Sequence, residues 1–71
     1  MNNVLETLNS RQFAEYLKNN YRFFKVYSEN KYIGTAKSIF GYFAYVEEIG
    51  EKRRIIDFYD TSNGGCLLYV K

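Results

Sequence analysis

The spacing of hydrophobic residues changes near residue 20, and this change divides the chain into two parts. Between residues 10 and 19, the apolar residues Phe13, Ala14 and Leu17 recur at intervals of three and four. This spacing is typical of a helix that buries one stripe of its surface. From residue 21 onward, apolar and polar residues alternate with a period near two, and Tyr, Phe, Ile and Val dominate. That alternation indicates β-strands.

The start of the predicted helix carries a capping signal. Asn9 precedes the first helical position and Gln12 follows three residues later, which is the spacing of a capping box. Asn3 and Glu6 repeat this spacing upstream. We therefore expect residues 1–20 to be helical, with a bend or break near Asn9.

Turn residues separate five predicted strands. The strands are expected at residues 21–28, 32–38, 42–49, 53–59 and 66–70, and the turns at Glu29-Asn30, Gly41, Gly50-Glu51 and "DTSNGG". Short loops and the lack of a second helix argue against crossover connections, so neighbouring strands are expected to be antiparallel. The predicted fold is a single α+β domain over residues 1–71. Its N-terminal helical segment packs on a strongly bent antiparallel β-meander of four or five strands, which occupies about residues 21–71.

Strand alternation gives the predicted sheet two apolar faces. The first face, which we expect the helix to cover, holds Phe24, Val26, Tyr42, Ala44, Val46, Ile56, Phe58, Cys66, Leu68 and Val70. The second face is rich in aromatic residues and holds Phe23, Tyr27, Phe43, Tyr45, Ile55, Tyr59, Leu67 and Tyr69. A helix of about ten residues is roughly 15 Å long and cannot cover both faces. Either the sheet curls, with bends at Gly34 and Gly41, or the second face meets a partner.

Composition limits the disulfides, metal sites and cellular location that we expect for the protein. The chain has one cysteine and no histidine, so neither an internal disulfide nor a zinc site with nitrogen and sulfur ligands is expected. It contains no secretion-signal pattern and no apolar run near the roughly 20 residues of a membrane helix. The expectation is a cytoplasmic protein without cofactor or metal that has no membrane partner.

Candidate catalytic groups are few. Cys66 lies in the apolar segment "CLLYV", where a buried and unactivated thiol is expected. Several carboxylates gather with Lys52, Arg53 and Arg54 around one hairpin, which indicates charge balance on an exposed turn. The absence of histidine removes the commonest general base. The sequence therefore predicts no enzyme activity and no catalytic residues.

Basic residues are concentrated among the aromatic residues of the first strands. Residues 21–46 carry four basic groups and one acidic group, although the net charge of the whole chain is only +2. Tyrosine and phenylalanine beside scattered cations form the composition of protein-binding hot spots. The predicted partner-binding residues are Tyr27, Phe43, Tyr45, Tyr59, Tyr69, Arg22, Lys25 and Lys37.

These residues favour a small, stand-alone, non-enzymatic protein-binding protein. The small size and the Lys, Asn, Tyr and Ile content are typical of phage or mobile-element accessory proteins, including inhibitors of a host enzyme or defence complex of the anti-CRISPR type. The alternative is a single-stranded nucleic-acid or regulatory DNA-binding protein, in which Tyr27 and Tyr45 stack on bases and Lys25 and Lys37 follow the phosphates. A homodimer through an edge strand is also expected, with "CLLYVK" at residues 66–71 as the less protected edge.

Overall fold

The computed structural model describes residues 7–71, and the elements follow the predicted order. They are α2 (Ser10–Asn20), β1 (Phe23–Ser28), β2 (Lys31–Phe40), β3 (Phe43–Val46), β4 (Glu51–Asp60) and β5 (Gly65–Val70). The α+β class, with an N-terminal helix followed by a β-meander, is therefore confirmed. The expected helical turn at Asn3 to Glu6 lies outside the described residues.

The helix α2 begins as the capping signal predicts. The Asn9 side chain accepts a hydrogen bond from the Gln12 amide (2.9 Å), and the Gln12 side chain accepts one from the Asn9 amide (3.2 Å). Helix starts leave amide groups without partners inside the helix, and such a capping box satisfies them reciprocally. Phe13, Ala14 and Leu17 are all buried, so the predicted apolar stripe is confirmed.

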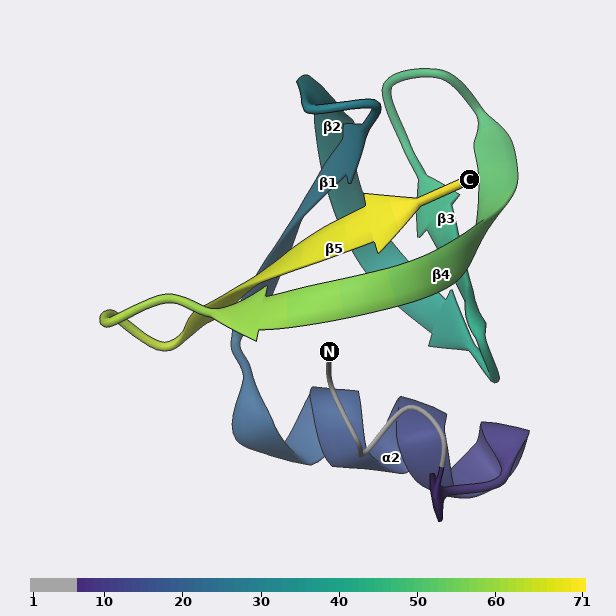
Figure 1. Ribbon diagram of the computed structural model, residues 1–71, viewed down its shortest axis with the longest axis vertical. Helices are drawn as coiled ribbons and strands as arrows, with labels where there is room; N and C mark the ends of the chain where they lie inside the picture. Colours follow the sequence, from purple (N-terminus) through teal and green to yellow (C-terminus); the bar gives the residue numbers. More distant parts are fainter. Residues whose placement is uncertain (1–6) are drawn as a thin grey trace.

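The five strands close into a barrel in the order β1-β2-β3-β4-β5 (Figure 1). Consecutive strands are antiparallel, whereas β1 and β5 pair in parallel from Phe23 opposite Gly65 to Tyr27 opposite Tyr69. The predictions that the first and last strands are free edges and that all neighbours are antiparallel are therefore wrong. In a five-strand meander the first and last strands run in the same direction, so closure must pair them in parallel.

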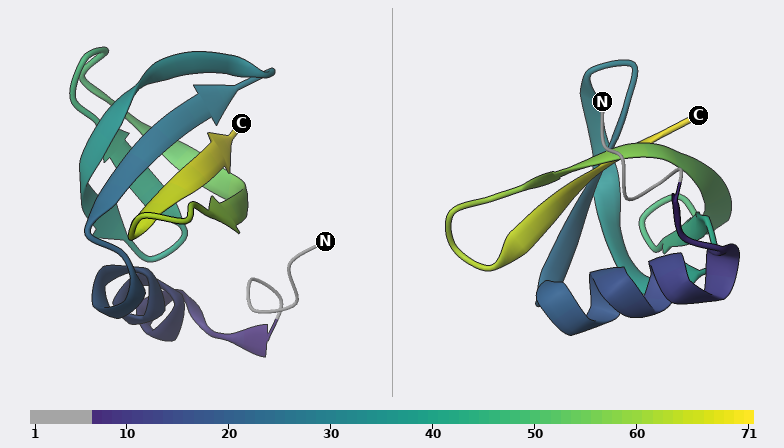
Figure 2. Two further views of the ribbon diagram at one scale, coloured as in Figure 1. Left: turned by 90° about the vertical axis from the view of Figure 1, so that its left-hand side faces the viewer. Right: turned by 60° about the horizontal axis from the view of Figure 1, so that its bottom comes forward.

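The helix lies across one end of the barrel, below the strands in Figure 1 and in both views of Figure 2. The Phe13 ring contacts the rings of Tyr42 and Phe58, with centroids 5.6 Å and 5.5 Å away. The Tyr42 hydroxyl also donates a hydrogen bond to the Leu8 carbonyl oxygen (2.6 Å). The helix therefore closes the barrel end instead of covering the face of an open sheet.

The first predicted face forms the barrel interior, with a correction in β4. Ile55 is 1% exposed and Ile56 is 53% exposed, which reverses their predicted sides. The β4–β5 register shifts between Ile55 and Asp57, and such a bulge inserts one residue and exchanges the sides of the residues that precede it. Phe58 lies beyond the bulge and is buried as predicted.

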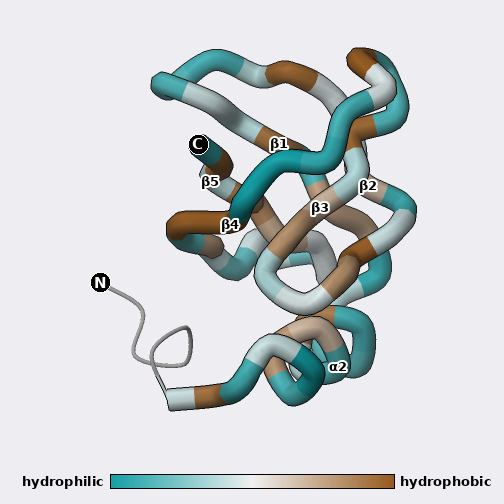
Figure 3. Tube along the Cα trace, turned by 90° about the vertical axis from the view of Figure 1, so that its right-hand side faces the viewer, coloured by the Kyte–Doolittle hydropathy of each residue, from teal (hydrophilic) through white to brown (hydrophobic). Residues whose placement is uncertain are grey.

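The long strands β2 and β4 each connect two parts of the barrel that contain different strand pairs. Each pairs with different neighbours along its length, and β4 begins as a hydrophilic run before it becomes hydrophobic (Figure 3). Gly34 in β2 has a φ of +145°, a conformation that residues with a side chain rarely adopt. A Cβ at this position would lie 2.9 Å from Val46 Cγ1. A steric reason therefore exists for glycine at this position, where the sequence predicts a bend.

Candidate functional site

Four tyrosines gather on the outer surface of β4, β5, β1 and β2. Tyr69 of β5 lies opposite Tyr27 of β1, and Tyr27 lies opposite Tyr32 of β2. Tyr59 of β4 lies opposite Leu67, two residues before Tyr69. Residues that are opposite or diagonal on one face of a sheet lie within side-chain reach. We call Tyr27, Tyr32, Tyr59 and Tyr69 the tyrosine cluster.

The rings of the tyrosine cluster contact one another in a continuous row. Tyr27 stacks on Tyr69, with ring centroids 5.5 Å apart and 22° between the ring planes. Tyr32 meets Tyr27 edge to face at 5.6 Å, and Tyr59 meets Tyr69 edge to face at 5.4 Å. Each such pair contributes about 0.5–1.5 kcal/mol beyond the burial of its surface. These contacts therefore orient the rings without any partner.

The two outer members of the tyrosine cluster are open to solvent. Tyr32 is 48% exposed and Tyr59 is 50% exposed, whereas Tyr27 and Tyr69 are half-buried between them. The Tyr59 hydroxyl donates a hydrogen bond to Asp57 Oδ2 (2.7 Å). This bond holds the phenol proton and raises the pKa of Tyr59 above its ordinary value. Tyr59 therefore presents ring surface together with a hydroxyl group that keeps its proton.

The curl of the sheet decides which of the two predicted apolar faces is buried and which is exposed. The barrel closes with the first face inward, and the second, tyrosine-rich face lies outside. Tyr27, Tyr45, Tyr59 and Tyr69 are absent from the buried core. The curl therefore leaves these side chains accessible to other molecules.

Phe43 and Tyr45 lie elsewhere on the barrel. They belong to β3, which pairs with β2 and β4, whereas the tyrosine cluster spans the strands around the β1–β5 seam. Lys52 Nζ lies 5.3 Å from the centroid of the Phe43 ring, and the guanidinium carbon of Arg54 lies 5.8 Å from it. The structure therefore separates Phe43 and Tyr45 from the tyrosine cluster and places cations beside them.

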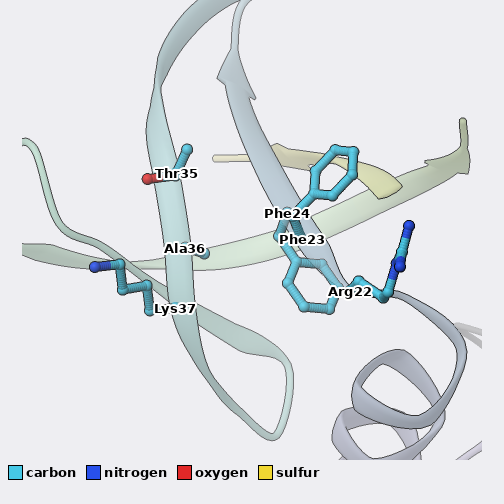
Figure 4. Close-up of a pocket in the computed structure, with 6 residues that line it drawn as sticks. All are labelled: Arg22, Phe23, Phe24, Thr35, Ala36 and Lys37. Atoms are coloured by element: carbon cyan, nitrogen blue, oxygen red, sulfur yellow. The ribbon is translucent and has the colours of Figure 1, made fainter. Parts of the chain in front are cut away.

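The predicted cations Arg22 and Lys37 lie at a groove between β1 and β2 (Figure 4). The groove has a volume of about 400 Å³ and is lined by Arg22, Phe23, Phe24, Thr35, Ala36 and Lys37. Lys25 lies opposite Thr35, two residues before Tyr27. It therefore stands between the groove and the tyrosine cluster.

The predicted partner-binding residues do not include Tyr32, although the sequence contains a signal for it. Glu29 and Asn30 have φ values of +52° and +64°, the left-handed conformations of a two-residue hairpin turn. Such a turn fixes the register of the strands that it joins, and here it sets Tyr27 opposite Tyr32. The predicted turn at Glu29-Asn30 was therefore sufficient to place Tyr32 beside Tyr27.

The thiol of Cys66 is one of the candidate catalytic groups considered from the sequence. Cys66 is buried, and burial raises the pKa of its thiol to about 12, so the nucleophilic thiolate is not formed near neutral pH. Within residues 7–71, no three His, Cys, Asp or Glu side chains are grouped to hold a metal ion. In the same range, no helix has the length and apolar character needed to cross a membrane.

Comparison of the chain with models of protein families, with curated proteins and with solved structures gives no significant match. The function proposed below therefore rests on the geometry and chemistry of this molecule.

Proposed function

We propose that this protein is a non-enzymatic binding protein that recognises another protein through the tyrosine cluster. The observation that carries this proposal is the row of contacting tyrosine rings on the outside of a barrel whose interior is filled by other side chains. Large aromatic patches on the surface of small proteins mark interaction sites. Tyrosine is also enriched among the residues that dominate binding energy at protein interfaces.

The charges around the tyrosine cluster favour a protein partner over a nucleic acid. Asp57 accepts the hydrogen bond from Tyr59, and Asp60 follows Tyr59 directly in the chain. Carboxylates repel phosphates, whereas a surface that follows a nucleic-acid backbone needs cations along its length. Mixed charge around an aromatic centre instead suits a protein interface, in which a polar rim surrounds the buried contacts.

Stoichiometric inhibition of a host enzyme or defence complex by a phage or mobile-element protein is the specific form of this proposal. Such an inhibitor needs a rigid contact surface and no catalytic groups of its own. The stacked rings of Tyr27 and Tyr69 support this form, because side chains that are already oriented lose little conformational entropy on binding.

Affinity capture from a host lysate, with and without nuclease, tests the proposal. Tyr32→Ala and Tyr59→Ala should each weaken capture by about 2 kcal/mol or more, the loss expected at a hot spot. Each variant removes one ring pair of the tyrosine cluster, and Tyr59→Ala also removes the hydrogen bond to Asp57, so stability should fall by about 0.5–1.5 kcal/mol in Tyr32→Ala and by about 1–3 kcal/mol in Tyr59→Ala. Phe40→Ala is the matched control, because Phe40 is aromatic, 56% exposed and outside the tyrosine cluster.

Two outcomes would contradict the proposal. Capture that survives both Tyr32→Ala and Tyr59→Ala would show that the tyrosine cluster is not the binding surface. Equal loss with Phe40→Ala would show that the effect is not specific to it. Light scattering across a wide concentration range shows whether the partner is a second copy of the chain, since a monomer mass throughout excludes a homodimer.

A second candidate function, binding of single-stranded nucleic acid or regulatory DNA, is favoured by the surface of β3. The Phe43 ring has Lys52 and Arg54 beside it, and aromatic rings next to cations stack on bases and contact phosphates. This function predicts binding of a (dT)12 oligonucleotide that weakens steeply with salt and is lost in Phe43→Ala. Binding that tolerates salt and depends on Tyr59 instead supports the protein partner.

A further inference from the structure

Strands β1 and β2 are paired along only part of their lengths. Their register ends at Lys25 opposite Thr35. Before Lys25, Phe23 and Phe24 pair with β5, and beyond Thr35 strand β2 pairs with β3. Within residues 7–71, each strand therefore has one stretch of edge at the groove that no other strand covers.

A bulge interrupts the pairing of β2 with β3 next to this groove. The β2–β3 register passes from Ala36 to Ser38, so Lys37 has no paired residue on β3, and the β1 register has already ended. The extra residue of a bulge is left outside the hydrogen-bonded ladder. Uncovered strand edges bind extended chains through main-chain hydrogen bonds. The groove therefore offers a place for an added strand.

The groove combines apolar surface with positive charge. Phe23 and Phe24 line the groove from β1 with their rings on different sides of the strand, and Arg22 and Lys37 lie at its two flanks (Figure 4). Arg22 forms no ion pair with any residue between 7 and 71. Lys37 lies 3.7 Å from Glu47, and both side chains are exposed. Exposed pairs of this kind contribute little stability, so a carboxylate of a ligand can replace Glu47.

We propose that this groove binds an extended acidic segment of a partner polypeptide. The segment adds as a strand along the stretch of β2 that follows Thr35, where β1 no longer pairs with it, and places its carboxylates near Arg22 and Lys37. Only a polypeptide backbone supplies hydrogen-bond donors and acceptors at the spacing of a strand, and opposite charge selects among segments. The inference rests on the proposed function in taking a polypeptide as ligand, but the site is separate from the tyrosine cluster.

A library of random dodecapeptides, displayed against the full chain, supplies the probe. The enriched peptides should carry Asp or Glu at alternate positions, and the strongest binder is then synthesised with a fluorescent label. Arg22→Glu and Lys37→Glu should each weaken its binding by about tenfold or more. Lys18→Glu, a charge reversal on the exposed side of α2, should change the affinity by less than about twofold. Methylation of alternate peptide amides should abolish binding, because it removes the main-chain donors.

Tyr59→Ala distinguishes failure of this inference from failure of the proposed function. A peptide in the groove should bind Tyr59→Ala as tightly as the parent. Loss of binding in Tyr59→Ala would place the peptide on the tyrosine cluster, which overturns the groove site and supports the proposed function. Enrichment of no peptide, or of peptides that bind Arg22→Glu and Lys37→Glu unchanged, also overturns the groove site. Tighter binding of (dT)12 that is sensitive to the same reversals would identify a nucleic acid as occupant and overturn it as well.

Discussion

Replacement of Leu17 by alanine tests whether α2 closes the barrel. Leu17 is fully buried in the core, so truncation removes apolar contacts and leaves a cavity. Substitutions of this kind cost about 2–5 kcal/mol. At about 0.05–0.15 kcal/mol per residue, the stability of a chain of 71 residues is about 4–11 kcal/mol. The substitution should therefore remove a large share of the free energy of unfolding.

Thermal and urea unfolding, followed by circular dichroism, measure this loss. A loss of about 3 kcal/mol should lower Tm by about 12–24 °C, since a domain of this size loses about 4–8 °C per kcal/mol. Lys18→Ala is the matched control, because Lys18 is the next residue of the helix and is exposed. Its stability should change by no more than about 0.5 kcal/mol. An equal denaturant slope in all three proteins would show that the difference is one of stability and not of compactness.

A Leu17→Ala variant that melts within about 2 °C of the parent would refute the packing described for α2. Phe13→Ala gives an independent measurement, because the Phe13 ring contacts the rings of Tyr42 and Phe58. Its expected cost is about 3–5 kcal/mol. Small losses in both variants would mean that the helix does not close the barrel end in solution.

Three further experiments probe single contacts. Gly34→Ala should lower stability by more than about 1 kcal/mol, because the Gly34 φ is +145° and a Cβ would lie 2.9 Å from Val46 Cγ1; an unchanged urea midpoint would contradict this. The Thr35 amide donates a hydrogen bond to Glu48 (2.8 Å) and lowers the pKa of that carboxyl below its ordinary value of 4.5. The ionised Glu48 carboxylate therefore stabilises the fold at pH values above 4.5, and this contribution is lost as the pH falls through the lowered pKa. Glu48→Gln should be less stable than the parent near neutral pH, and the difference should vanish in acid. Because burial raises the pKa of Cys66 to about 12, a disulfide reagent at mildly alkaline pH should label the thiol only after unfolding; rapid labelling of the native protein would show that it is accessible.

The local elements of the fold are predictable because their signals lie within a few residues of one another. Asn9 and Gln12 define the helix start through two hydrogen bonds across three residues. The sides on which Ile55 and Ile56 lie are not predictable in this way. Both residues are isoleucine, so the residue type does not distinguish the one that points inward from the one that points outward. The bulge that decides their sides is a property of the β4–β5 ladder, which joins segments whose register the sequence pattern leaves open.

The sequence predicts part of the spatial grouping of the candidate residues. Tyr27, Tyr59 and Tyr69 were assigned to one surface, and the structure brings their rings together. Phe43 and Tyr45 were assigned to the same surface because alternation gives them the same side of a sheet. In a closed barrel, however, one side of the sheet faces outward in every direction. Two residues can then share a side and still lie on different parts of the molecule, as these do.

The pairing of β1 with β5 links the stability of the protein to its proposed binding surface. This pairing covers the edges that a meander would otherwise leave free, and it also sets Tyr27 opposite Tyr69. The central stacked pair of the tyrosine cluster therefore exists only while the barrel is closed. A partner that binds this pair binds the closed barrel and not the unfolded chain, so it must stabilise the fold in proportion to its affinity and concentration. A change that opens the seam should then weaken binding even where it leaves every tyrosine in place.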